Sequence, residues 1–393
     1  VAHAGPADPA ENAGDHGGEA GSKVRRLHIA YVITQSDSIG GASIHVRDLA
    51  SAMLEEGNQV EVLVGGNGPF CEMLREREVR VISVPHLVRE INPLWDFRAY
   101  KEIKGILEKL RPDIVHAHSS KAGVLGRYAA FNLGIPSLFT AHGFSFTEGI
   151  HPVKRQFYKW VERAAAKKGN GIIAVSEYDR QLAIREKVCS PSQIVTIHNG
   201  IPDIPPKLRA DPARQPPRLV MVARFDKQKN HKLLLDALAE LRELDWHLEL
   251  IGDGPLKKEM EAHANLLGLK ERVSFPGLCN DVAARLAKCQ LFLLISNWEG
   301  LPLTIIEAMR AGLPVVCSDV GGCRELVEDG NNGWLLPKQN KKEKLSFFLA
   351  NSINNPLIRI LFGNRSRKIF ENQLKITVML NKTRSCYSKL INI

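Results

Sequence analysis

The stretch Glu299-Gly-Leu-Pro-Leu-Thr-Ile-Ile-Glu307 decides the fold that we expect for this chain. A strand-like apolar run, 291–295, comes before it, and the helix-forming run 303–311 carries the second glutamate. Pro302 suits the start of a helix, because its missing N–H has no intrahelical partner there. A helix N-terminus is therefore expected between two acids at the C-terminal edge of a strand. Its free N–H groups suit a phosphate, and the acids suit hydroxyl groups, so a nucleotide sugar fits this arrangement.

The bulk composition is that of an ordinary globular protein with more than one domain. The chain has 393 residues, which is long for a single core. Its hydrophobic fraction is 44% and its charged fraction is 24%, both typical of globular proteins. The longest apolar runs are strand-sized, so we expect no transmembrane helix. The first residues also lack the apolar central stretch that a secretory signal needs.

Cysteine usage and charge limit the compartment and the partners. Seven cysteines are scattered without a Cys-x-x-Cys pair, which predicts free thiols in a reducing cytoplasm rather than a disulfide framework or a zinc site. The net charge is +10, and the basic excess lies at the two ends of the folded chain, away from the glutamate pair. Nucleic acid and an anionic membrane surface both attract such regions. Ordinary solvated basic faces explain the excess equally well.

Alternating strand-like and helix-like runs predict an α/β protein with two parallel sheets. Residues 1–22 have the composition of a disordered tail. Strand-like runs such as 114–118 and 137–141 alternate with helices over 23–200, and the alternation restarts over 218–370. The proline-rich stretch 201–217 between them has linker composition. We expect two Rossmann-like domains that face each other across a ligand-binding cleft, and a final helix in 371–393 that crosses back to the first domain.

Other candidate residues stand where strands end and helices begin, which is where such folds bind ligands. Gly40 and Gly41 follow the first strand and would let the backbone approach a ligand closely. Arg224 and Lys229 follow the first strand of the second domain. They could neutralise a diphosphate, since a guanidinium fork matches phosphate oxygens. Taken alone, each of these segments is equally typical of an ordinary turn.

Together these segments resemble the family-4 glycosyltransferases of the GT-B fold over residues 27–389. The most specific likeness is the run 296–316, continued through 318–327 and 330–336, where residue identities agree and not only the spacing of the two acids. The resemblance implies a retaining transfer of a hexose or N-acetylhexosamine from a nucleoside-diphosphate sugar, with UDP as the expected nucleotide. It also implies that no cofactor and no metal ion take part.

The resemblance gives the candidate residues individual roles. Glu307 would accept hydrogen bonds from the ribose, and Glu299 would contact the transferred sugar. Arg224 and Lys229 would stabilise the departing diphosphate and do the work of a metal ion. The expected catalytic residues are Glu299, His142, Arg224 and Lys229. The expected donor-binding residues are Gly40, Gly41, Arg224, Lys229, Gly300, Leu301, Leu303, Thr304 and Glu307.

The first domain would bind the acceptor. The resemblance places His118 and Lys121 at the acceptor side and His142 beside the donor sugar. His116 and His118 share one face of a strand and could suggest a metal site. No third ligand has a persuasive spacing, so we expect no metal there. A histidine with a purely structural role is the alternative interpretation of His118.

A basic, aromatic segment at 151–168 could bring the chain to a lipid surface. Phe157, Tyr158 and Trp160 interleave with lysines and arginines at helical spacing. A helix with a core-facing aromatic stripe and a solvated basic face has the same pattern. The 119–123 segment resembles family members that build bacterial surface polysaccharides on lipid-linked carriers. We therefore expect a cytoplasmic enzyme, peripheral on the inner face of the plasma membrane, that adds a sugar to a saccharide or lipid-linked acceptor in polysaccharide, lipopolysaccharide or glycan assembly and binds no nucleic acid.

Other functions remain open at this point. A non-hydrolysing nucleotide-sugar epimerase shares the two-domain architecture and needs acid and base carboxylates in the cleft. A non-catalytic nucleotide-sugar-binding protein would have lost one of the two acids or two cations named above, and all four are present. A Rossmann dehydrogenase would need Gly-x-Gly-x-x-Gly after the first strand, whereas residues 36–43 read Ser-Asp-Ser-Ile-Gly-Gly-Ala-Ser.

Overall fold

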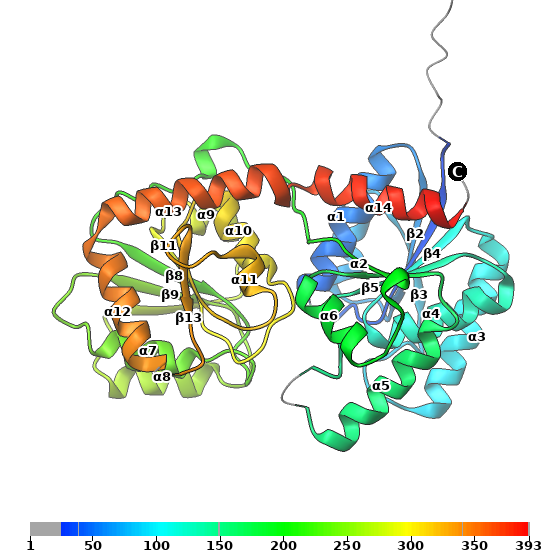
Figure 1. The fold of residues 1–393 in the computed structure, drawn as a ribbon, viewed down its shortest axis with the longest axis horizontal. Coiled ribbons are helices and arrows are strands. Elements are labelled where there is room, and N and C mark those ends of the chain that lie inside the picture. Colours follow the sequence, from blue (N-terminus) through cyan, green and yellow to red (C-terminus); the bar gives the residue numbers. More distant parts are fainter. Residues whose placement is uncertain (1–24, 38, 148–149, 340, 392–393) are drawn as a thin grey trace, which may run out of the picture.

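The computed structural model describes residues 25–37, 39–147, 150–339 and 341–391. Two domains lie side by side, one coloured blue to green and the other green to orange (Figure 1). The tail expected at 1–22 lies outside the described residues. Within the described ranges, no helix is both long and apolar enough to cross a bilayer.

The first domain is built on a seven-stranded sheet with the order β3-β2-β1-β4-β5-β6-β7. Every neighbouring pair is parallel. The strands are β1 (His28–Ile33), β2 (Gln59–Gly65), β3 (Arg80–Val84), β4 (Ile114–His118), β5 (Ser137–Ala141), β6 (Gly171–Ala174) and β7 (Ile194–Thr196). The helices are α1 (Gly41–Glu55), α2 (Pro69–Arg75), α3 (Pro93–Leu110), α4 (Ser120–Leu133), α5 (Pro152–Ala166) and α6 (Glu177–Arg185).

The central strand β1 is apolar from Ile29 to Ile33, because helices cover both faces of the sheet. Tyr31 of β1 packs in a core with α1, α2 and the C-terminal helix α14 (Ile376–Leu390). Its neighbours Ala30 and Val32 point to the opposite face, into a core with α3, α4 and α6. The continuous apolar run that predicted a buried parallel strand therefore serves two separate cores.

The second domain repeats the design on a six-stranded parallel sheet with the order β10-β9-β8-β11-β12-β13. Its strands are β8 (Arg218–Val222), β9 (His247–Ile251), β10 (Val273–Gly277), β11 (Leu291–Leu294), β12 (Val315–Ser318) and β13 (Gly333–Leu336). Its helices include α7 (His231–Ala239), α8 (Lys257–Leu266), α9 (Val282–Leu286), α10 (Leu303–Ala311) and α11 (Cys323–Leu326). In both sheets the strand order reverses at the centre, as in doubly wound Rossmann folds. The expected architecture of two Rossmann-like α/β domains is confirmed.

The C-terminal helices connect the two domains. After α12 (Lys341–Asn354), α13 (Pro356–Ile369) lies on the second domain and the red helix α14 lies along the first (Figure 1). A π-helical turn, η3 (Phe370–Leu374), joins α13 to α14. The hydroxyl of Tyr387 on α14 hydrogen-bonds that of Tyr31 at 3.1 Å and His116 Nδ1 at 2.7 Å. These buried contacts hold the end of the chain on the first domain.

Candidate functional site

The carboxyl ends of the two sheets meet around the start of α10. The side chain of Asn199 in the first domain donates to the carbonyl of Leu301 at 3.3 Å. A methyl group on Gly41 would lie 3.7 Å from Leu303, and one on Gly300 would lie only 2.8 Å from the carbonyl oxygen of His142. Residues 300–303 therefore lie directly against the first domain. The fold brings the predicted donor-binding residues of both domains to one place.

The N-terminus of α10 offers backbone donors to an anion. The helix begins at Leu303, directly after Pro302, and no side chain caps it. The carbonyl of Gly300 accepts the N–H of Gly322 at 2.8 Å, which anchors the turn that leads into the helix. A helix start without a capping side chain, with its positive dipole end toward the cleft, favours a bound phosphate.

Glu299 and Lys229 form an ion pair in this structure. Lys229 Nζ contacts Glu299 Oε1 directly, and the side chain of Lys229 is 12% exposed and that of Glu299 is 5% exposed. Ser296 Oγ donates to the same carboxylate at 2.6 Å and Gln228 Nε2 at 3.1 Å. Three donors therefore fix the orientation of Glu299, and the ammonium group balances its charge.

The second predicted cation, Arg224, is held much less firmly. Its side chain is 57% exposed, and its nearest acid, Asp226 Oδ2, lies 3.8 Å from Nε. A contact this long on an exposed side chain contributes little stability. Arg224 follows β8 and can change rotamer at small cost to meet a ligand.

Glu307 lies on α10 and is half-buried. Burial raises the pKa of its carboxyl group, while the nearby Arg310 and Arg47 oppose that rise. The carboxylate of Glu307 accepts no hydrogen bond from the residues that the structure describes. A half-buried carboxylate with open acceptor positions suits the paired hydroxyls of a ribose.

The residues predicted at the acceptor side lie at the end of β4 (His118) and in the first turn of α4 (Lys121), and His142 follows β5. His118 Nδ1 and His142 Nε2 share a hydrogen bond of 3.1 Å. Lys121 is 12% exposed and forms an ion pair with Asp96 at 2.6 Å, so it is bound to α3 rather than extended into the cleft. His116 has a structural role, because Tyr387 and Thr140 occupy both of its nitrogens at 2.7 Å each.

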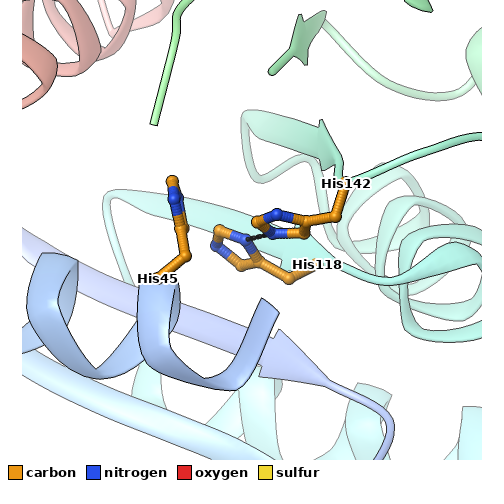
Figure 2. Close-up of side chains that lie close together, drawn as sticks. All are labelled: His45, His118 and His142. Atoms are coloured by element: carbon orange, nitrogen blue, oxygen red, sulfur yellow. Dashed lines mark hydrogen bonds between the residues drawn. The ribbon is translucent and has the colours of Figure 1, made fainter. Parts of the chain in front are cut away.

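A third imidazole, which the sequence analysis missed, completes this cluster. His45 of α1 lies with its ring centroid 4.7 Å from that of His142 and 5.4 Å from that of His118 (Figure 2). Burial lowers the pKa of His45 to about 4 and holds those of His118 and His142 well below the usual value. His45 is 73 residues from His118 in sequence, so spacing carries no signal. The one sequence feature that suggests a place near the site is its position one helical turn after Gly41.

The cleft widens beside Glu299 into a pocket of about 540 Å³. Its walls come from α6 of the first domain, from α11 and from the loops that follow β11, β12 and β13, including Trp298, Gly321 and Lys338. Of the predicted site residues, Glu299 alone lines this pocket. Glu325 of α11 closes one end by accepting backbone N–H groups at the start of α6.

Two Rossmann-like domains that meet at such a site define the GT-B architecture, the fold of one large class of glycosyltransferases. Residues 39–203 match the model for Glycosyltransferase Family 4, and residues 206–368 match that for Glycosyl transferases group 1. The chain belongs to glycosyltransferase family 4, and the family expected from the sequence is confirmed.

The similar proteins support this family membership. UDP-Gal:alpha-D-GlcNAc-diphosphoundecaprenol alpha-1,3-galactosyltransferase of Escherichia coli is 30% identical over 84% of this chain and 89% of its own length. The O-antigen biosynthesis glycosyltransferase WbnH, also of Escherichia coli, is 26% identical over 82% of this chain and 89% of its own length. The crystal structure of Anabaena Alr3699/HepE in complex with UDP and glucose matches with a TM-score of 0.78 and 22% identity, and the match covers 93% of this chain and 100% of that one. This last likeness supports the fold alone.

Proposed function

We propose that this enzyme is a retaining, metal-independent glycosyltransferase that moves a hexose or N-acetylhexosamine from a UDP-sugar to a lipid-linked saccharide. The observation that carries the proposal is the arrangement of Glu299, Lys229 and Glu307 around the uncapped start of α10. One acid is paired with Lys229 and oriented for a sugar, the other is open to a ribose, and the start of α10 lies between the two acids in the sequence. The relatives whose names specify a UDP-sugar donor or a diphosphoundecaprenol acceptor support the choice of substrates.

The charges of the site fit the departure of a nucleoside diphosphate. The bond between the anomeric carbon and the diphosphate oxygen breaks, and its electron pair leaves with the diphosphate. Lys229, Arg224 and the N–H groups at the start of α10 stabilise that negative charge. The acceptor hydroxyl attacks the oxocarbenium-like sugar on the same face and gives its proton to the departing diphosphate. We assign no enzyme nucleophile.

Lys229 changes partner in this scheme. Without donor it neutralises Glu299, and the bound diphosphate then competes for the same ammonium group. Glu299 remains held by Ser296 and Gln228, so its carboxylate stays oriented when the sugar hydroxyls arrive. The ion pair thus keeps both residues ordered before the substrate binds, which lowers the entropic cost of binding, while the diphosphate must offset the ion pair that Lys229 gives up.

The acceptor side carries an exposed apolar surface suited to a membrane. On α5, Val153, Phe157 and Trp160 are 72%, 49% and 64% exposed, and on α3 Leu94 is 58% exposed. The helices α3 and α5 both contact α4, whose first turn carries Lys121. Aromatic side chains on a basic helix prefer the bilayer interface. We infer that the enzyme is peripheral on the inner, cytoplasmic face of the plasma membrane and takes its acceptor there.

Vesicle co-sedimentation tests the membrane part. The double variant Phe157→Ala with Trp160→Ala should lose most binding to anionic vesicles, because it removes two exposed aromatic side chains. Leu266→Ala is the matched control, since Leu266 is 85% exposed but lies on α8 of the second domain. Equal binding of the double variant and the control would refute the α5 surface.

Thermal stabilisation tests the donor. UDP, GDP, ADP and NADH are added without metal to the native chain and to Glu307→Ala. We expect UDP alone to stabilise the native chain, and the variant to lose that effect. Glu343→Ala, on the remote helix α12, is the control. An epimerase would convert the UDP-sugar with no acceptor present, and a non-catalytic binding protein would bind UDP without consuming the sugar nucleotide, so product analysis separates both alternatives.

A further inference from the structure

The three imidazoles beside the cleft form a compact group of nitrogen ligands. One nitrogen from each of His45, His118 and His142 lies within 4.8 Å of the other two. The residues come from α1, from the end of β4 and from the loop after β5, so three separate elements of one rigid domain fix them (Figure 2). His45 and His118 are buried, whereas His142 is partly exposed and connects the group to the cleft.

The hydrogen bonds around His45 leave one of its ring nitrogens with a free lone pair. Asn199 donates through Nδ2 to Leu301, so its Oδ1 faces His45 as an acceptor at 2.9 Å from Nδ1. His45 Nδ1 therefore carries the proton, and its Nε2 carries a lone pair. A histidine that donates one ring N–H to an oxygen and presents the other nitrogen is the usual arrangement at a metal.

His118 supplies the second, independent observation. Its side chain is fully buried, and its Nε2 has no hydrogen-bond partner among the described residues. The less costly tautomer donates through Nδ1 to His142 and leaves a lone pair on Nε2, because an unpaired buried N–H costs more than an unpaired lone pair. A buried imidazole nitrogen with a free lone pair is available to coordinate a metal ion. The neighbouring His116 lacks this feature, since both of its nitrogens are bonded.

We propose that His45, His118 and His142 bind one borderline transition-metal ion, with Zn²⁺ the best match, and that the fourth coordination position opens to the cleft. Three histidines with an open fourth position are a recurring zinc arrangement. Imidazole nitrogens without a carboxylate disfavour Mg²⁺ and Ca²⁺, which prefer oxygen. Tetrahedral zinc needs ligand atoms roughly 3.4 Å apart, so the nitrogens must draw together by up to about 1.4 Å from the 4.8 Å limit. His142 must also exchange its hydrogen bond from His118 for the bond to the ion.

This ion would inhibit the enzyme rather than assist it. His142 and His118 are the residues that we propose lie beside the donor sugar and the acceptor, so a metal that binds both would occupy the position of the reacting groups. This consequence rests on the proposed function, whereas the metal site itself does not. Zn²⁺ should lower the rate of sugar transfer, and a chelator should restore it.

A Co²⁺ titration of the full chain tests the site without any sugar substrate. Co²⁺ bound by nitrogen ligands in a tetrahedral site gives strong visible absorption, and Zn²⁺ should displace it with one equivalent per chain. We expect His45→Gln and His118→Gln each to weaken Zn²⁺ binding by about tenfold or more, since even the loss of a ligand's supporting hydrogen bond costs that much. His263→Gln, which removes a histidine paired with Asp236 at 2.6 Å on the second domain, should bind as the native chain does.

The outcomes separate the two parts of the proposal. Circular dichroism of the metal-free variants first establishes that they fold, and whichever of the two folds is used for the comparison. Absence of the visible band, or Zn²⁺ affinity that neither substitution changes, would overturn the site. A site that binds Zn²⁺ while an active enzyme keeps its full rate would overturn the inhibition. If the chain proved not to transfer sugars at all, the cobalt spectrum would still decide whether the metal binds.

Discussion

Removal of Glu325 should open the two domains. Glu325 of α11 in the second domain accepts the backbone N–H groups of Glu177 and Tyr178 at 2.7 and 2.9 Å, and it also accepts from His198 Nε2 at 2.8 Å. All three donors belong to the first domain, and two of them are the first free N–H groups of α6. A carboxylate in this position is stabilised by the helix dipole as well as by the hydrogen bonds. We therefore predict that Glu325→Ala shifts the protein toward an open form.

The size of the shift follows from these three contacts. A hydrogen bond to a charged group contributes about 1.5–3 kcal/mol when it is lost within a folded protein. In the open form water replaces all three donors, so the free-energy cost of the substitution is smaller than the sum of the three hydrogen bonds. With the side chain 15% exposed, we expect about 2–4 kcal/mol in total. That corresponds to roughly a 30- to 700-fold change in the ratio of closed to open protein.

Small-angle X-ray scattering and donor affinity measure the effect. The radius of gyration should rise in Glu325→Ala, and UDP should bind more weakly because, under the proposed function, both domains contribute to its site. Glu325→Gln keeps one acceptor oxygen and should fall between the native chain and Glu325→Ala. Glu328→Ala is the control, since Glu328 bonds Asn331 within its own domain. An unchanged radius of gyration together with unchanged UDP affinity would refute the reasoning.

The same contact should respond to pH. Burial raises the pKa of Glu325, but the hydrogen bonds from His198 and from the two backbone N–H groups outweigh it and lower the pKa below the usual value. The stabilising effect is thus fully present above the ordinary pKa of a glutamate. It is lost as the pH falls through the lowered value, because protonation removes the charge that the donors favour. The native chain should expand on acidification within that range, whereas Glu325→Ala should not.

Three further substitutions test other parts of the structure. Asp179→Asn should raise the free energy of unfolding at pH 7 by up to about 3 kcal/mol, since burial raises the pKa of Asp179 to about 6 and the charged form destabilises the fold. Below the ordinary pKa of 3.8 the native carboxyl group is protonated in both the folded and the unfolded chain, so thermal melts near pH 4 should show almost no gain. Arg359→Leu should cost about 3–5 kcal/mol in urea unfolding, because the buried guanidinium donates to four backbone carbonyls that would lose their partner, whereas Arg365→Leu should cost little. Gly40→Ala should leave the melting temperature unchanged, since its methyl group meets nothing within 4 Å, yet weaken UDP binding about tenfold if the ligand lies there.

Local patterns predicted most of the elements that position the site. The expected helix 303–311 is α10, and the expected strands 114–118 and 137–141 are β4 and β5. A proline at a helix start and an apolar run of strand length are local signals that span only a few residues, so they can be recognised in a single sequence. Consecutive strands in the sequence are usually neighbours in a sheet, and within the two sheets only the steps from β3 to β4 and from β10 to β11 depart from this among the described strands.

Contacts between distant segments were not predictable in this way. Neither His45 nor Glu325 was singled out, because each acquires its role from residues that are 73 or more positions away. Lys121 was expected at the acceptor side, and its ion pair with Asp96 became visible only once α3 and α4 packed together. The aromatic segment of α5 fitted a buried or an exposed stripe equally well, and the structure places Trp160 outside and Tyr158 against the core.

The two basic side chains of the site, Lys229 and Arg224, differ in how firmly the folded chain holds them. Lys229 and Arg224 were given one role from sequence, yet the structure separates them: Lys229 is 12% exposed and paired with Glu299, whereas Arg224 is 57% exposed and weakly held. An enclosed pair fixes the position of charge before the donor arrives, and a loosely held guanidinium can follow the diphosphate as it departs. The first arrangement lowers the cost of binding, and the second stabilises charge that develops only during the reaction. Under the proposed function, a site that contains both would bind the intact donor and still favour its cleavage, as transfer without a metal ion would require.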